Sequence, residues 1–191
     1  MLLDLYIYPH PILFKQAEPV TTFDASLKTL IADMTETMYE GNGVGLAAPQ
    51  IGKSIALFIV DTSAPEETSS LKAYINPKII VADHPIVWNE GCLSLPGLYK
   101  DVSTFGHVII EAQDENGEWF REEAHELRAV ALLHEFGHLE GHVFIDRLSP
   151  FNQSRVKRYW AKHYRREVER TYADSKVQCV LANDTEDGKS R

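Results

Sequence analysis

The residues with the clearest chemical potential are two histidines that flank a glutamate, in the segment His134-Glu135-Phe136-Gly137-His138. On a helix, residues i and i+4 share one face, so both imidazoles can reach one metal ion while Glu135 lies beside it. A metal ion with an open position lowers the pKa of bound water from 15.7 to about 7, and a nearby carboxylate can then accept the proton. Neutral imidazole suits zinc, iron, nickel and cobalt, so the pair does not name the metal. The spacing predicts a metal-dependent hydrolase.

These residues leave the third metal ligand open. A metzincin protease would need histidine where Phe144 stands, so the sequence excludes a metzincin site. A gluzincin would need a downstream glutamate, and Glu167 and Glu169 are available without any supporting motif. Cys92 is the remaining strong candidate, because a thiolate with two imidazoles leaves one tetrahedral position for water. Cys92 could instead be a small buried apolar residue, or a nucleophile with a histidine base.

The metal motif must be positioned by a helix, and apolar periodicity predicts one over residues 126–140. A second helix is predicted over 24–41, where apolar residues recur at helical spacing between an N-capping aspartate and a glycine. A last helix is predicted from 150 to 172, because Ser149-Pro150 suits an N-cap followed by the first helical position.

Strands are predicted upstream of the metal helix. Apolar runs at 55–60 and 73–82 indicate two of them, with Pro77 marking an edge or a bulge. A hairpin is predicted from 107–113 and 118–124, joined by an Asn-Gly turn. Strands first and helices afterwards favour an α+β domain.

Length and composition limit the remaining choices. The chain has 191 residues and a formal net charge of -9, which argues against a protein that wraps nucleic acid with its whole surface. No apolar run approaches the roughly 20 residues that span a bilayer, and no cleaved signal is expected at the N-terminus. Two cysteines make no disulfide framework, so we expect a cytoplasmic protein. We predict a single catalytic domain over 1–172 and a polar, disordered tail over 173–191.

Three segments together, in order and spacing, resemble the three motifs of the peptide deformylases. They are Gly43-Val44-Gly45-Leu46-Ala47-Ala48-Pro49-Gln50, Glu90-Gly91-Cys92-Leu93-Ser94 and His134-Glu135-Phe136-Gly137-His138. The resemblance covers about residues 1–165. It implies hydrolysis of the N-formyl group from the N-terminal formyl-methionine of nascent polypeptides, with release of formate. The expected fold is α+β, with mostly antiparallel strands packed around the central helix of the metal motif and with a C-terminal helix.

The resemblance also implies an active site. It implies one divalent metal ion per chain, with Fe(II) as the physiological ion and zinc, nickel or cobalt able to occupy the site. The implied metal ligands are Cys92, His134 and His138. Glu135 would transfer the proton, while the Gln50 amide and the Leu93 backbone N–H would donate to the formyl oxygen. One such donor lowers the barrier by on the order of 3 kcal/mol.

For the substrate, the resemblance implies a small apolar pocket that receives the methionine side chain. The implied lining residues are Trp88, Leu127, Val130 and Ala131. The last three share a helical face with His134, although such a face could also be ordinary core. Backbone groups of Val44, Gly45 and Gly91 are expected to pair with an extended peptide.

Three positions depart from the family pattern. The family usually carries aspartate where Gly137 stands, and arginine where Tyr99 and Thr104 stand. If Thr104 replaces the arginine that would face that aspartate, both partners of an ion pair are absent together. Removing both partners is much milder than leaving one buried charge without its partner, so we predict an intact site. The loss of arginine at Tyr99 is expected to change the grip on the peptide beyond methionine.

The last predicted helix is basic, although the chain is acidic. Residues 150–172 carry seven Lys and Arg against two Glu: Arg155, Lys157, Arg158, Lys162, Arg165, Arg166 and Arg170 form the basic set. A solvated charged face is the default interpretation. The resemblance implies a functional alternative, contact of this helix with ribosomal RNA near the nascent-chain exit. Two functional alternatives also remain, a general zinc metallopeptidase and a deformylase-like binding protein with reduced activity.

Overall fold

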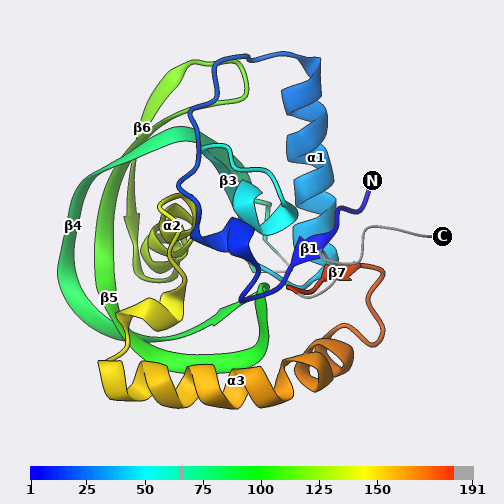
Figure 1. Ribbon diagram of the computed structural model, residues 1–191. Helices are drawn as coiled ribbons and strands as arrows, with labels where there is room; N and C mark the ends of the chain where they lie inside the picture. Colours follow the sequence, from blue (N-terminus) through cyan, green and yellow to red (C-terminus); the bar gives the residue numbers. More distant parts are fainter. Residues whose placement is uncertain (65–66, 183–191) are drawn as a thin grey trace.

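The computed structural model describes residues 1–64 and 67–182 (Figure 1). Its helices are α1 (Ala25–Glu40), α2 (Glu126–Leu139) and α3 (Pro150–Thr171). A five-stranded antiparallel sheet has the order β2-β3-β4-β5-β6. Its strands are β2 (Gly45–Ala47), β3 (Leu57–Val60), β4 (Lys72–Cys92), β5 (Leu95–Gln113) and β6 (Trp119–His125). A separate parallel pair joins β1 (Leu5–Tyr6) to β7 (Cys179–Val180).

The sheet curves around α2, which lies inside the curl, while α3 runs along one end of the molecule (Figure 1). Side chains alternate along β5, so that Val108, Ile110 and Ala112 face inward and are fully buried. They pack in one cluster with Leu132 and Leu139 of α2. The predicted α+β fold, with antiparallel strands around the central helix and a C-terminal helix, is confirmed.

The predicted helix ends are also observed. Asp24 caps α1, because its Oδ1 accepts hydrogen bonds from the backbone N–H groups of Ser26 at 2.9 Å and Leu27 at 3.1 Å. Ser149 caps α3 by accepting from the Asn152 N–H, and a proline follows at the first helical position. These caps satisfy donors that have no partner within a helix.

The two longest strands exceed their predicted lengths. The sequence predicted strands over 73–82 and 107–113, whereas β4 has 21 residues and β5 has 19. The missed stretches contain Pro85 and Gly106, which usually interrupt strands. The register shifts at three points along β4, including one between Ile75 and Lys78 beside the expected irregularity at Pro77. Such bulges let one strand continue while it bends.

A second core lies on the other side of the molecule, where α1, α3, β1 and β7 meet. Val177 and Leu181 are buried in this core, and Cys179 pairs in register with Leu5. The predicted disorder is therefore wrong for 173–182, because apolar residues within this polar segment find a place in the core. The remaining part of that prediction, 183–191, lies outside the described residues. Among the described residues, no helix is long and apolar enough to cross a membrane.

Candidate active site

The three predicted metal ligands come from two elements. His134 and His138 lie one turn apart on α2, with ring centroids 5.1 Å apart, while Cys92 ends β4. The Cys92 Sγ lies 3.3 Å from the His138 Nε2. One ligand atom from each of the three residues lies within 4.8 Å of the others. A thiolate with two imidazoles suits iron and zinc and leaves a coordination position open, so these residues fit a catalytic metal ion.

A buried ion pair orients the first of these histidines. The His134 Nδ1 lies 2.8 Å from a carboxylate oxygen of Glu90, and the Arg147 guanidinium also contacts that carboxylate. Burial alone would raise the pKa of Glu90, but its contacts with His134 and Arg147 outweigh burial and lower the pKa. Bonding at Nδ1 leaves Nε2 as the ring nitrogen available to a metal ion. A carboxylate is a common partner for the second nitrogen of a metal-bound histidine.

Glu135 lies between the metal motif and the glycine-rich loop. Its side chain is buried, and burial raises its pKa to about 7. Its Oε2 has no hydrogen-bond partner among the residues that the structure describes. A Cβ at Gly45 would overlap the Glu135 carboxylate, so only glycine permits this approach of β2 to α2. A carboxyl group whose pKa is near neutrality is suited to accept and return a proton.

Gln50 and Leu93 both lie next to Cys92, Gln50 by contact and Leu93 as the following residue. The Gln50 Oε1 accepts from the Ala47 N–H at 2.8 Å, which fixes the orientation of the amide. Its Nε2 then points to the Cys92 Sγ at 3.4 Å and to the Ser94 Oγ at 3.2 Å. Leu93 follows Cys92 in the turn before β5, and its carbonyl accepts from the Tyr172 hydroxyl at 2.8 Å. Both predicted donors therefore lie beside the candidate metal ligands.

One cavity of about 440 Å³ gathers nearly all the predicted site residues. Twelve of the 13 line it: Val44, Gly45, Gln50, Trp88, Gly91, Cys92, Leu93, Leu127, Val130, Ala131, His134 and Glu135. His138 lies behind them, fully buried, against Cys92. Three segments far apart in sequence thus build one hollow, with an apolar wall from α2 beside the candidate metal ligands.

The sequence did not predict a further part of this wall. Thr171, Tyr172 and Ser175, at the end of α3 and just beyond it, line the same cavity. The Tyr99 ring lies against Gly91, where a Cβ would overlap it, and Tyr99 itself is 64% exposed. No local pattern signals that the end of α3 returns to the site, because this contact depends on tertiary packing.

The positions of Gly137 and Thr104 agree with the predicted loss of a pair. Both line a second cavity of about 420 Å³, on another side of His134. The Thr104 Oγ1 is buried and has no hydrogen-bond partner among the described residues. A Cβ at Gly137 would meet only the His142 carbonyl oxygen, at 3.9 Å. Each residue therefore leaves room where a larger side chain would fit.

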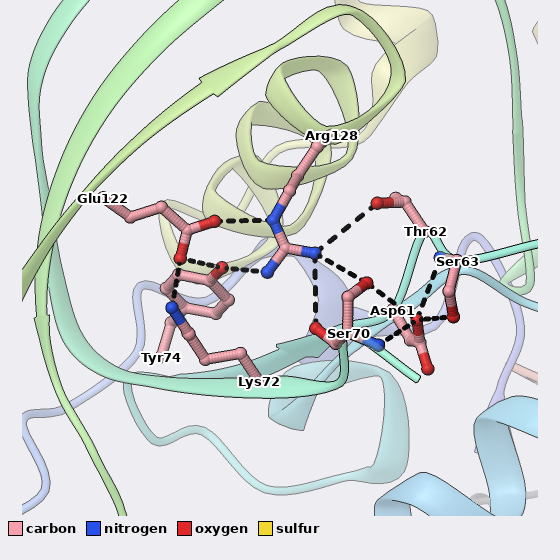
Figure 2. A network of polar contacts seen from close by, with 8 residues as sticks. All are labelled: Asp61, Thr62, Ser63, Ser70, Lys72, Tyr74, Glu122 and Arg128. Atoms are coloured by element: carbon pink, nitrogen blue, oxygen red, sulfur yellow. Dashed lines mark hydrogen bonds and ion pairs between the residues drawn. The ribbon is translucent and has the colours of Figure 1, made fainter. Parts of the chain in front are cut away.

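A polar network fixes the start of α2 (Figure 2). The Arg128 Nε donates to Glu122 of β6 at 2.5 Å, and its Nη2 donates to the Tyr74 hydroxyl at 2.8 Å. Its Nη1 reaches the Ser70 carbonyl of the segment that follows β3, at 3.4 Å. Asp61, which begins this segment, donates its backbone N–H to the Val44 carbonyl at 2.9 Å. The network links the catalytic helix to the loop that lines the cavity.

Comparisons with known proteins agree with this site. The sequence model of the family described as "Polypeptide deformylase" matches residues 2–154. The peptide deformylase of Syntrophobacter fumaroxidans is 44% identical over 161 residues, which cover 84% of this chain and 95% of the relative. That of Chromobacterium violaceum is 44% identical over 156 residues, which cover 82% and 92%.

Solved structures give the same result for the fold. The crystal structure of a peptide deformylase from Legionella pneumophila has a TM-score of 0.81 and 38% identity, and the match covers 88% of this chain and 98% of that chain. A Synechococcus elongatus peptide deformylase in complex with actinonin has a TM-score of 0.79 and 35% identity, covering 83% and 88%. The chain belongs to the peptide deformylase family.

Proposed function

We propose that the protein hydrolyses the N-formyl group from the N-terminal formyl-methionine of nascent polypeptides and releases formate. The observation that carries the proposal is the convergence of Cys92, His134 and His138 around one position, with Glu135 and Gln50 beside it. Family membership over most of the chain supports the same reaction.

The proposed roles follow from the positions of the side chains. When bound, the metal ion would activate water and polarise the formyl carbonyl. Glu135 would take a proton from the attacking water and return it to the leaving amine. The Gln50 amide and the Leu93 N–H would donate to the formyl oxygen as negative charge develops there. Glu90 would hold His134 in place through its Nδ1.

The proposed methionine pocket is the apolar part of the cavity. Leu127, Val130 and Ala131 of α2 and Trp88 of β4 line it. A flexible thioether side chain suits such a lining. The Val44 carbonyl already accepts from Asp61, so we propose that the Val44 N–H pairs with the peptide, together with backbone groups of Gly45 and Gly91.

We propose Fe(II) as the physiological ion, with zinc, nickel or cobalt able to replace it, because the mixed thiolate and imidazole set accepts all four. We also propose that the protein acts in the cytoplasm, where nascent chains are made and a cysteine ligand stays reduced. The single-domain organisation of 1–172 is part of the same proposal, extended by the packing of 173–182 into the core.

Contact with the ribosome is proposed for the basic face of α3. Arg158, Lys162 and Arg165 are exposed, whereas Val156 and Trp160 of the same helix are buried in the core. Truncation of α3 would therefore disturb the fold, and substitution of the three basic residues by glutamine is the better test. We expect weaker ribosome binding with a shallower salt dependence, and unchanged formate release. Unchanged, salt-independent binding would contradict this contact.

One assay tests the main proposal. The protein is purified anaerobically, its metal content is measured, and formate release from a formyl-Met peptide is compared with cleavage of internal peptide bonds. We expect formate release without internal cleavage. Cys92→Ala should lose metal and activity, while Glu135→Gln should retain metal and lose activity. Cys179→Ala is the matched control, because Cys179 lies in β7, outside the cavity, and should leave both unchanged.

The same assay separates the alternatives. Internal cleavage would identify a general metallopeptidase, whereas bound metal without either product would identify a binding protein. Either result would contradict the proposed reaction.

A further inference from the structure

Three histidines and two carboxylates gather on the sheet, apart from the catalytic cavity. Asp83 and His84 come from β4, His107 from β5, and Glu123 and His125 from β6. None of these five residues lines either cavity described above. Nothing in the proposed deformylase reaction uses them.

The sheet register places these side chains in one row. Asp83 lies opposite His107, and His107 lies opposite His125, so three neighbouring strands contribute one residue each. Glu123 precedes His125 by two positions and therefore faces the same side of the sheet. The neighbouring residue of β5, Val108, is buried against α2, so the row occupies the outer face. Strand pairing, rather than a mobile loop, holds the row together.

Three of these residues have separations that suit a metal ion. The Glu123 Oε1 lies 2.9 Å from the His107 Nε2 and 3.7 Å from the His125 Nε2. Tetrahedral zinc bonds of about 2.0–2.1 Å place neighbouring ligand atoms about 3.3 Å apart. The two imidazole rings are stacked, with centroids 4.8 Å apart and an interplanar angle of 18°. One ligand atom from each of the three residues lies within 4.8 Å of the others, and the exposed side chains of Glu123 and His125 are free to rotate toward a shared ion.

Asp83 orients the shared histidine. Its Oδ1 lies 2.6 Å from the His107 Nδ1, and the His107 side chain is only 12% exposed. Metal-bound histidines commonly donate their second ring N–H to a carboxylate, which fixes the tautomer. Glu90 makes the same contact with His134 at the catalytic site, at 2.8 Å. The outer face therefore repeats an arrangement that the chain uses at its candidate metal centre.

We propose that His107 Nε2, Glu123 and His125 bind a second divalent ion of the zinc class, with Asp83 as the residue that positions His107. The ion takes the place of the proton on Nε2. Three protein ligands leave room for water, because Glu123 and His125 are 60% and 64% exposed. The other nitrogen of His107 faces Asp83 and His84, but the His84 side chain is 76% exposed and its backbone has a positive φ of 55°. Its greater exposure makes His84 less well fixed as a ligand than His107, whose side chain is 12% exposed.

Ion counting tests the proposal. Tag-free holoenzyme is dialysed against Zn²⁺, and bound zinc-class ions are counted per chain. We expect two ions for the native chain and one for His125→Ala or His107→Gln. His84→Ala is the matched control and should keep two. Cys92→Ala should lose only the catalytic ion, which separates this site from the proposed function. Asp83→Asn should weaken the outer site about 10- to 100-fold, with full occupancy restored at high Zn²⁺.

Two results would overturn the proposal. The first is a single ion per chain in the native protein. The second is a second ion that His84→Ala abolishes and His125→Ala retains, since this would move the ligand set to Asp83, His84 and the Nδ1 of His107. Perturbation of the His107 and His125 ring signals in NMR spectra by Zn²⁺, without change at His84, would support it independently of activity.

Discussion

The Gln50 amide lies beside Cys92, where we propose that it donates to the formyl oxygen. Its Oε1 is held by the Ala47 N–H, so the Nε2 cannot turn away from Cys92 without breaking that bond. We expect Gln50→Ala to lower kcat about 10²- to 10³-fold, because a fixed donor is lost from the transition state. Steady-state formate release measures this effect, with the exposed Gln16→Ala as the control. A change confined to KM would show that Gln50 only binds substrate.

Gly137 is a helix-interior glycine with space around it. Because a Cβ there meets only the His142 oxygen, Gly137→Ala should raise the free energy of unfolding by up to about 1 kcal/mol. Urea unfolding measures the change, and formate release should stay the same. Gly137→Asp alone should not raise activity strongly, since Thr104 offers no positive charge. A large joint gain in stability and activity would contradict the inferred loss of both partners.

The sequence indicated the residues that the structure gathers at the candidate active site. It did not indicate the residues from distant segments that contact them. Cys92, His134 and Glu135 stand in short motifs whose spacing is itself informative. Arg147 and Tyr172 reach the site only because a 3₁₀ turn and the end of α3 pack against it. Such contacts join segments with no common pattern, so local sequence could not reveal them.

Among the secondary-structure elements, α2 was predicted well because its apolar positions recur at helical spacing and Gly141 follows its end. The long strands β4 and β5 were predicted only in part. Their outer faces mix polar and apolar residues, and Pro85 with its neighbour His84 reads as a turn. Pairing with β5 nevertheless continues through this stretch, with Asp83 opposite His107 and Pro85 opposite Phe105, which is a tertiary effect on local preference.

Arg128 connects α2 to the sheet through hydrogen bonds to Glu122 of β6 and Tyr74 of β4. Its side chain is 19% exposed and that of Glu122 is 12% exposed, so substitution of Arg128 by methionine leaves a largely buried carboxylate without its main partner. We expect Arg128→Met to lower the free energy of unfolding by about 2 kcal/mol. Adding Glu122→Gln should recover part of this loss in a double-mutant cycle. Strictly additive effects would contradict the coupling.

At the scale of the whole molecule, the environment of Asp61 predicts that the free energy of unfolding depends on pH in the acid range. Burial alone would raise its pKa, but hydrogen bonds from Ser63, Ser69 and Tyr39 outweigh burial and lower the pKa well below its usual range. The unfolded chain therefore binds a proton more readily than the folded chain. The stabilisation is complete above about pH 4 and is lost as the pH falls further toward the pKa of the folded state.

Asp61→Asn measures this contribution. The variant should be less stable than the native chain at pH 7, and the difference should narrow as the pH falls below about 4. Urea unfolding at several pH values gives both quantities. If the difference in free energy of unfolding between the two chains stayed constant with pH, Asp61 would act through packing rather than through its charge.

The pairing of β1 with β7 has a consequence for the order in which the protein assembles. Leu5 lies beside Cys179, and Ile7 donates its N–H to the Val180 carbonyl, so nearly the whole described chain separates the two partners. Closing so long a loop is slow, and β1 gains no stabilising contact with β7 until residues 179 and 180 are present. During synthesis the curled sheet and α2 can form first, but β1 must wait until residue 180 has left the ribosome. An enzyme that acts on chains still being made thus completes this part of its own core only after its own β7 has been synthesised.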